Sequence, residues 1–152
     1  PRNHLRPFEP ESNEGHPLSD HGKTPQAREV DMFTDLLDGG LTSGQIVWRP
    51  YQEPGRDAVD VYWLFTAEDT GAAEAYIANQ LPDSHTDQHR HRGFELVFVL
   101  EGEIADDQGG VYRPGSLLVQ RPGTTHRMSS STGCKVLVFR QHRVTPAPAA
   151  GA

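Results

Sequence analysis

Apolar and polar residues alternate in short runs over most of the chain after Gly44, and this period of two is typical of β-strands. Turn-forming pairs such as Pro-Gly and Gly-Gly separate several of the runs. Many short strands divided by turn signals predict an all-β fold, a jelly-roll barrel or sandwich. The expected strands cover 45–48, 58–65, 73–81, 95–105, 116–120 and 135–144.

A different pattern precedes the strands. Thr24-Pro25 has the residue types of a helix start, and Gly39-Gly40 is a good helix stop. We therefore predict a short amphipathic helix over 25–38. Its apolar residues recur at helical spacing: Val30, Phe33, Leu36 and Leu37.

The two ends of the chain have little apolar character. Residues 1–23 are rich in Pro and charged side chains and cannot bury enough surface to offset their ordering entropy, so we expect a flexible arm. Residues 145–152 are rich in Pro, Ala and Gly and predict a flexible tail. The predicted organisation is thus the arm, a helix and turn over 24–43, one β domain over 44–144, and the tail, within a chain of 152 residues.

Charge and cysteine content exclude several function classes. Fourteen basic against 21 acidic residues give a net charge of −7, and no stretch gathers the basic ones, so we expect no binding to nucleic acid or to an anionic membrane. The apolar runs are too short to span a bilayer. Cys134 is the only cysteine, which excludes intramolecular disulfides and cysteine-rich zinc modules. These features, without a signal-peptide pattern, predict a cytoplasmic location.

The eight histidines are unevenly placed, and three of them suggest a metal site. On an extended strand His89 and His91 point to the same side, about 7 Å apart, and Glu95 shares their parity. His126 follows a Pro-Gly turn and can return to the same cavity from an antiparallel strand. An isolated H-x-H would suit an exposed polar loop, but the acid and the later histidine favour metal binding. Three nitrogens and one carboxylate suit Fe(II), Zn(II), Mn(II), Co(II), Ni(II) or Cu(II).

Residues 82–140 resemble the cupin superfamily. Its first motif, G-x5-H-x-H-x3,4-E-x6-G, has Asp83 at the leading glycine and is otherwise matched by His89, His91, Glu95 and Gly102. Its second motif, G-x5-P-x-G-x2-H-x3-N, is recognisable in Gly115, Gly123 and His126. Three features depart from this motif: Pro122 stands directly before Gly123 instead of two residues before it, one extra residue follows Gly115, and Ser130 replaces the Asn.

Over 47–144 the chain is most similar to the ChrR-like cupin subgroup, through His-Arg-His-x-Gly-x-Glu, Tyr-x-Pro-Gly, Arg-Pro-Gly-x-x-His and Gly-Cys. That subgroup includes the zinc-binding cupin domain of anti-sigma factors and small Fe(II) dioxygenases that cleave diketones or dihydroxyacetophenone. The resemblance implies one divalent metal ion per chain, with Fe(II) favoured for an oxygenase, then Zn(II), with Mn(II) or Ni(II) as further candidates.

We expect an Fe(II) dioxygenase acting, with O₂, on a small enolisable carbonyl compound. Two alternatives use the same four ligands. One is a zinc-binding sensory or binding domain. The other is a redox-neutral metal-dependent isomerase, lyase or biosynthetic cyclase.

The pocket beside the metal is expected to be lined by inward side chains, for which the candidates are Tyr62, Leu64, Tyr76, Val97 and Phe139. Tyr62 and Tyr76 are the catalytic candidates, because a phenol can hydrogen-bond a substrate oxygen; the alternative is plain barrel core. Arg90 and Arg92 are either solvated or bind an acidic group at the barrel mouth. His85 is expected to be solvated or close to the site, and His142 to lie on the surface.

The run from Glu95 to Leu100 is apolar on both strand faces. A barrel with a solvated outer face does not require this. Leu96 and Phe98 are therefore expected to face a second sheet, the predicted helix or another subunit, and we predict a homodimer.

Overall fold

The computed structural model describes residues 31–42 and 46–148, and most of its regular structure is β-strand. The two helical elements are short: a 3-10 helix η1 (Gly40–Thr42) and helix α1 (Ala67–Thr70). The longer strands are β2 (Arg56–Phe65), β3 (Glu74–Thr86), β5 (Glu95–Gly102), β8 (Leu117–Gln120) and β11 (Cys134–Arg140). The shorter strands are β1 (Arg49–Pro50), β4 (His89–Arg90), β6 (Ile104–Asp106), β7 (Val111–Tyr112), β9 (Thr125–His126), β10 (Met128–Ser130) and β12 (Thr145–Pro146).

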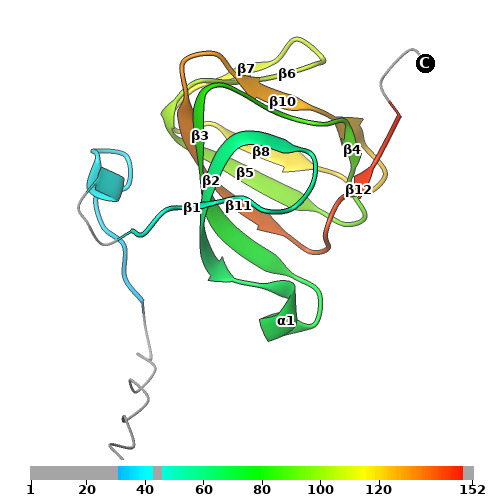
Figure 1. Cartoon of the computed structure of the whole chain (residues 1–152), viewed down its shortest axis with the longest axis horizontal. Coiled ribbons are helices and arrows are strands. Elements are labelled where there is room, and N and C mark those ends of the chain that lie inside the picture. Colours follow the sequence, from blue (N-terminus) through cyan, green and yellow to red (C-terminus); the bar gives the residue numbers. More distant parts are fainter. Residues whose placement is uncertain (1–30, 43–45, 149–152) are drawn as a thin grey trace, which may run out of the picture. The chain divides into compact units, whose positions relative to one another are not determined.

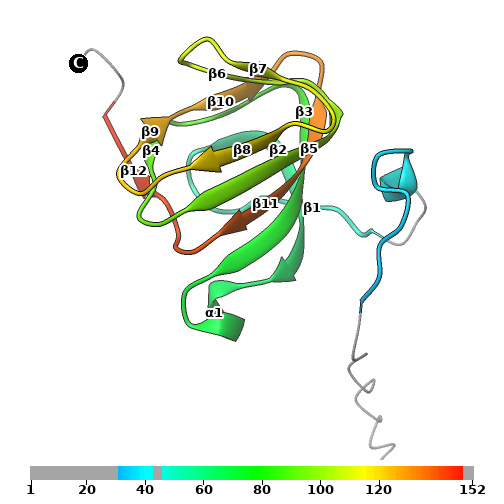
Figure 2. The same cartoon turned by 180° about the vertical axis from the view of Figure 1, so that it is seen from behind.

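Most strands form one curled sheet with the order β7-β6-β10-β3-β11-β5-β8, and β2 adds to β3 and carries β1. The order β12-β4-β9 forms a second, smaller sheet at one end of the curl (Figures 1 and 2). Strand β3 joins two parts of the large sheet, because Glu74–Gln80 pair with β11 whereas Ser84 and His85 pair with β10. This is the predicted all-β jelly roll.

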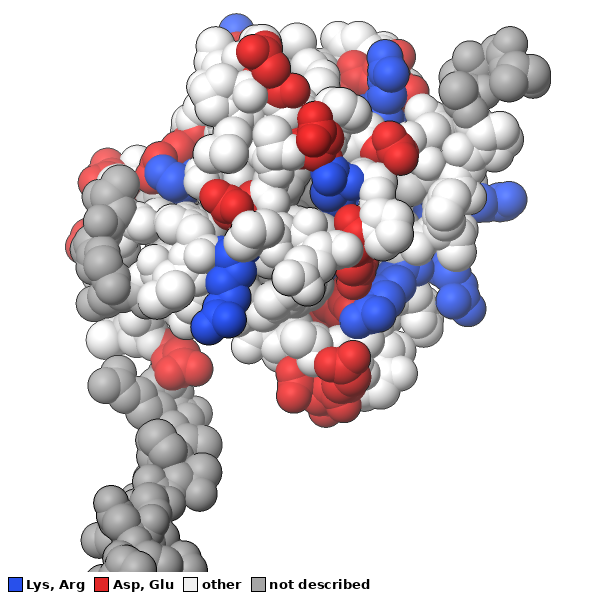
Figure 3. Space-filling view, viewed as in Figure 1, with Lys and Arg blue, Asp and Glu red and all other residues white. Residues whose placement is uncertain are grey.

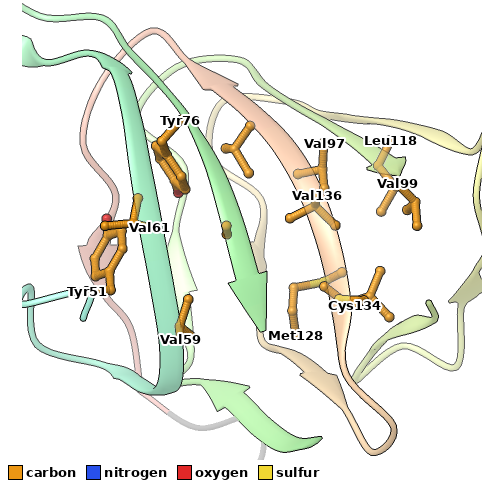
Figure 4. Close-up of a cluster of buried hydrophobic side chains, with 13 residues drawn as sticks. Tyr51, Val59, Val61, Tyr76, Val97, Val99, Leu118, Met128, Cys134 and Val136 are labelled. Carbon is orange, nitrogen blue, oxygen red and sulfur yellow. The ribbon is translucent and has the colours of Figure 1, made fainter. Parts of the chain in front are cut away.

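The barrel interior follows the period of two along each strand. In β5 the alternation places Glu95, Val97 and Val99 inside, up to Leu100, which is buried on the other face, and in β11 the residues with even numbers are buried. Thirteen buried side chains form the main cluster, among them Val97, Val99 and Val136, and Figure 4 shows them gathered between the strands. Cys134 is buried among them, as a core residue.

A smaller cluster lies on the other face of β3, β11 and β5, around Leu41, Ile77 and Leu100. Phe98 packs against this cluster, together with the segment that precedes β1. The apolar outer side of β5 is thus partly covered within the chain at Phe98, by the segment before β1, which is neither a second sheet nor the predicted helix. The homodimer stays a prediction.

The predicted helix over 25–38 is wrong for residues 31–38, which contain only a turn; residues 25–30 lie outside the described part. Asp35 has a φ of 56°, in the left-handed region, which does not fit an α-helix that continues to residue 38. The carbonyl of Asp35 instead accepts hydrogen bonds from the amides of Asp38 and Gly40, at 2.9 and 2.8 Å. Leu36 still packs against the smaller cluster. An apolar residue of the predicted helix is thus partly buried although no helix forms here.

The predicted tail is also partly wrong. Thr145 and Pro146 form β12 and pair with Arg90 and His89 of β4, and the amide of Ala147 donates to the carbonyl of Gln88 at 3.0 Å. The predicted strand 45–48 is replaced by β1 at 49–50, and the last long strand ends at Arg140 instead of 144. The predicted arm, residues 1–23, lies outside the described part of the chain.

Basic and acidic side chains are interspersed on the face seen in Figure 3, without a continuous basic stripe on that face. Within residues 31–42 and 46–148, no helix is long and apolar enough to cross a membrane.

Gly102, the last glycine of the first cupin motif, lies where β5 ends beside β11, and offers a test of the fold. Its φ is 70°, and an added Cβ would lie 2.2 Å from the carbonyl oxygen of Gly133. We expect Gly102→Ala to lower the free energy of unfolding by about 2 kcal/mol more than Gly109→Ala. Gly109 is the matched control, because its φ is 92° but no atom lies within 4 Å of an added Cβ. Gly109→Ala should therefore cost only the left-handed backbone conformation, about 1–2 kcal/mol. Urea denaturation of both variants measures the difference; equal losses would contradict the predicted clash.

Candidate metal centre

Four side chains from three neighbouring segments meet at one end of the barrel. His89 in β4 pairs directly with His126 in β9, which brings these two imidazoles to the same place. His91 is fixed beside them by backbone hydrogen bonds, from its own amide to the carbonyl of Thr124 at 3.0 Å and from the amide of Gly123 to its carbonyl at 2.8 Å. Glu95 opens β5 on the inward face. All four residues are buried.

The nitrogen atoms of the three imidazoles converge. The Nε2 atom of His126 lies 3.1 Å from Nε2 of His89 and 3.1 Å from Nε2 of His91. Glu95 Oε1 lies 3.9 Å from Nδ1 of His91. One ligand atom from each of the four residues can be chosen so that all lie within 4.8 Å of one another.

This arrangement fits one metal ion. Nitrogens that bind one ion at about 2.1 Å in octahedral or tetrahedral positions lie about 3.0–3.4 Å apart, close to the two 3.1 Å separations. The Nε2 atom of His126 carries at most one proton in a neutral ring and cannot donate to both neighbours. The close nitrogens are better satisfied by a shared cation than by hydrogen bonds alone.

The orientation of His89 favours metal binding as well. Its Nδ1 lies 2.8 Å from the carbonyl oxygen of Asp87, and a carbonyl can only accept, so this nitrogen carries the proton. The Nε2 lone pair therefore points toward the other histidines. Metal-ligating histidines commonly donate their second ring nitrogen to a backbone carbonyl in this way. Nδ1 of His126 is buried without a hydrogen-bond partner among the described residues.

Burial keeps the histidines neutral. It lowers the pKa of His89 to about 3 and of His91 to about 4, and it lowers the pKa of His126. The charge of Arg56 lowers all three pKa values further. Burial also raises the pKa of Glu95 to about 7, although Arg140 and Arg56 act in the opposite direction. At neutral pH the imidazoles thus keep the free lone pairs that a metal ion needs.

Three of the four residues, His89, Glu95 and His126, line a partly open cavity of about 40 Å³. The rest of the wall is mainly apolar. At about 10–15 Å³ for each water molecule, a cavity of this size holds roughly three waters or a small ligand group. The other lining residues are Tyr51, Arg56, Val59, Tyr76, Ala78, Gln80, Thr86, Val97, Ile104, Met128, Val136 and Val138.

Of the predicted pocket residues, Tyr76 and Val97 line the cavity and Tyr62, Leu64 and Phe139 do not. Tyr62 lies on the outer face of β2, where its ring packs edge-on against Phe33 with the ring centres 5.9 Å apart. Val59, Val61 and Trp63 occupy the inward positions of this strand. The prediction for Tyr62 as a pocket residue is therefore wrong.

The remaining candidate side chains are also placed. His85 is exposed, with Nδ1 3.8 Å from a carboxylate oxygen of Asp57, and it lies outside the cavity wall. His142 is exposed, as expected. Arg90 and Arg92 are exposed, which agrees with the solvated interpretation.

The sequence interpretation missed two arginines near the site, Arg56 and Arg140. Arg56 lines the cavity at the start of β2. Arg140, only 1% exposed, ends β11 and is the register partner of Glu95. Strand parity could have identified Arg140, since it continues the inward series of Cys134, Val136 and Val138. No comparable signal marks Arg56.

Arg140 belongs to a buried ion-pair network beside the cavity. Its Nε donates to Glu74 at 2.7 Å, and Glu74 is fully buried. The same guanidinium contacts the hydroxyl of Tyr51 at 3.1 Å and a carboxylate oxygen of Glu53 at 3.2 Å. Arg143 donates to the second oxygen of Glu74 at 2.6 Å. Burial raises the pKa of Glu74, but the hydrogen bonds and charges of the two arginines outweigh it and hold this carboxyl below its usual pKa.

Comparison with known proteins agrees with the geometry. The family described as the ChrR Cupin-like domain matches residues 40–144. No curated protein matches this sequence.

Solved structures share the fold at low sequence identity. The polyketide cyclase RemF from Streptomyces resistomycificus is 21% identical, with a TM-score of 0.57, over 67% of this chain and 78% of that one. An acetylacetone dioxygenase from Acinetobacter johnsonii is 16% identical, with a TM-score of 0.63, over 86% and 85%. Rhodobacter sphaeroides SigE in complex with the anti-sigma ChrR gives 24% identity and a TM-score of 0.50, over 62% of this chain and 48% of that chain. These likenesses extend across proteins with different functions.

Proposed function

This chain belongs to the ChrR Cupin-like family, and from that premise we propose that it is a mononuclear metal-dependent enzyme, an Fe(II) dioxygenase of a small enolisable carbonyl compound. His89, His91, Glu95 and His126 would hold the ion. When bound, iron supplies a Lewis acid for a substrate oxygen and a redox partner for O₂.

One observation carries the proposal: three of the four ligands are themselves part of the cavity wall. A structural zinc is closed off by its four protein ligands, whereas a catalytic ion keeps positions that substrate can reach. Here three of the donors face a partly open cavity, so a ligand in the cavity would lie against the ion.

The chain's own residues divide the remaining tasks. The neutral imidazoles donate lone pairs without adding charge, and the carboxylate of Glu95 offsets part of the charge of a divalent cation. Val97, Met128 and Val138 are among the apolar side chains that keep bulk water from the reacting atoms. The phenol of Tyr76, which also lines the cavity, is the candidate to donate a hydrogen bond to a substrate oxygen.

The volume of the cavity supports a small substrate. At about 40 Å³ it is far below the roughly 150 Å³ of an engineered cavity that binds benzene. Only a few atoms of a reactive group fit inside without rearrangement, so the remainder of a substrate, even of a small diketone, would lie outside the cavity.

Oxygen consumption tests this function. Fe(II)-loaded protein given acetylacetone should take up one O₂ for each diketone consumed and release a carboxylic acid, and the Zn(II)-loaded protein should not. Loss of a carbonyl substrate without O₂ uptake would instead support a redox-neutral isomerase, lyase or cyclase. Tight stoichiometric zinc without any turnover, across a panel of small diketones and hydroxyketones, would support a sensory or binding domain.

A further inference from the structure

Arg56 lines two neighbouring pockets, the cavity at the candidate metal site and a larger cleft. It lines the cavity together with the candidate metal ligands, and with His89 it also lines the cleft, whose volume is about 370 Å³. The loop before β2 and the segment after β11 provide most of the cleft wall, through Glu53, Pro54, Arg143, Val144 and Pro146. A ligand with its reactive end in the cavity and its remainder in the cleft would pass the side chain of Arg56.

The guanidinium of Arg56 has hydrogen-bonding capacity to spare. Its NH1 donates to the carbonyl oxygen of Gly55 at 2.8 Å, and the group lies over the ring of Tyr51, 5.7 Å from the ring centre. Within residues 31–42 and 46–148 no carboxylate lies within 4 Å of it. A guanidinium has five N–H donors, so most of those of Arg56 are free for a ligand.

Its neighbour in the cleft is different. Arg143 also lines the outer cleft, but it donates to Glu74 at 2.6 Å and lies 3.5 Å from Glu53. Its charge is thus already compensated. Among the described cleft residues, Arg56 is the cation that a ligand can neutralise.

We propose that Arg56 binds a carboxylate or enolate oxygen of the ligand, so that this site selects monoanionic organic compounds. The inference rests on the proposed function, since the reactive end of the ligand lies at the metal site. A planar guanidinium suits the two oxygens of a carboxylate or of an enolised diketone. Glu53 and Asp87 on the outer wall disfavour a second negative charge, so the part of the ligand in the cleft is neutral.

Binding of benzoate and of its neutral counterpart benzamide tests the proposal. Isothermal titration of metal-loaded protein should show benzoate bound more tightly than benzamide. Arg56→Gln should lower the affinity for benzoate about 10- to 100-fold, which is the contribution of a charge-assisted hydrogen bond. The affinity for benzamide should change by no more than about twofold. Arg56→Lys keeps the charge without the planar fork and should retain an intermediate preference for benzoate.

Arg49→Gln is the matched control, because it removes the same charge from an exposed position on β1. It should leave both affinities unchanged. The proposal is overturned if Arg56→Gln binds benzoate as tightly as the wild type, or if Arg49→Gln lowers the affinity for benzoate as much as Arg56→Gln does. It is also overturned if the wild-type protein does not bind benzoate more tightly than benzamide. Metal content, measured on the same samples, distinguishes these results from failure of the proposed function. If the protein prefers benzoate through Arg56 but takes up no O₂, the anion-binding role of Arg56 would be supported and the dioxygenase function would be contradicted.

Discussion

Replacing His126 with alanine is expected to lower metal affinity by more than about 100-fold, so that the variant purifies with less than about a tenth of an equivalent of metal. His126 is the central ligand, since its Nε2 atom lies 3.1 Å from those of both other histidines. Loss of a residue that merely supports a ligand typically costs 10- to 100-fold in affinity, and loss of a ligand itself should cost more. Metal analysis after dialysis against a defined Fe(II) or Zn(II) concentration measures the effect.

His85→Ala is the matched control for this experiment. His85 is an exposed histidine outside the cavity wall, and its loss should leave the metal content unchanged. Circular dichroism establishes that both variants are folded. A folded His126→Ala protein with one full equivalent of tightly bound metal would show that the ion is held elsewhere.

Replacing Arg140 with methionine is expected to lower the free energy of unfolding by about 3–5 kcal/mol, because it leaves a buried charge without its main partner. Glu74 and Arg140 are 0% and 1% exposed and are joined at 2.7 Å. Arg143 would still contact the second oxygen of Glu74, but it cannot replace the contacts of Arg140 with Tyr51 and Glu53. Urea denaturation measures the loss.

The double variant Glu74→Met/Arg140→Met separates this explanation from a simple packing defect. Removing both buried charges should recover part of the lost stability, because a matched apolar pair carries no desolvation penalty. Arg113→Met, which breaks an exposed pair with Glu103 at 2.9 Å, should cost no more than about 1 kcal/mol. A double variant less stable than Arg140→Met alone would contradict the account of the network.

The metal ligands were predictable because their geometry is local. His89, His91, Glu95 and Gly102 match a motif of fixed spacing. The single extended strand expected over the three ligands is interrupted, since β4 ends at Arg90 and β5 begins at Glu95, but their side chains still meet at one site. His126 required one long-range assumption, antiparallel return of a second strand, and the pairing of β4 with β9 confirms it. The fold was predictable for a similar reason, since each strand carries its own alternation.

Other features were mispredicted or missed. Residues 61–65 are five consecutive apolar side chains, and Tyr62 was assigned to the wrong face although it shares its parity with the polar Asp60 rather than with the buried Val59 and Val61. The apolar spacing before Gly39 looked helical, but the left-handed backbone of Asp35 breaks the helix. Strand parity marks Arg140 as inward, but its ion-pair partners and the position of Arg56 depend on contacts between residues distant in the sequence, which a single sequence does not reveal.

Nitric oxide binds iron only at a coordination position that the protein leaves open, so its binding to the Fe(II)-loaded protein tests whether the candidate site is catalytic. We expect the electron paramagnetic resonance signal of one high-spin iron-nitrosyl complex per chain. The signal should change when acetylacetone is added and should be lost in His126→Ala. Iron that binds stoichiometrically but gives no nitrosyl signal would contradict a catalytic site, because the four ligands would then close the ion off from the cavity.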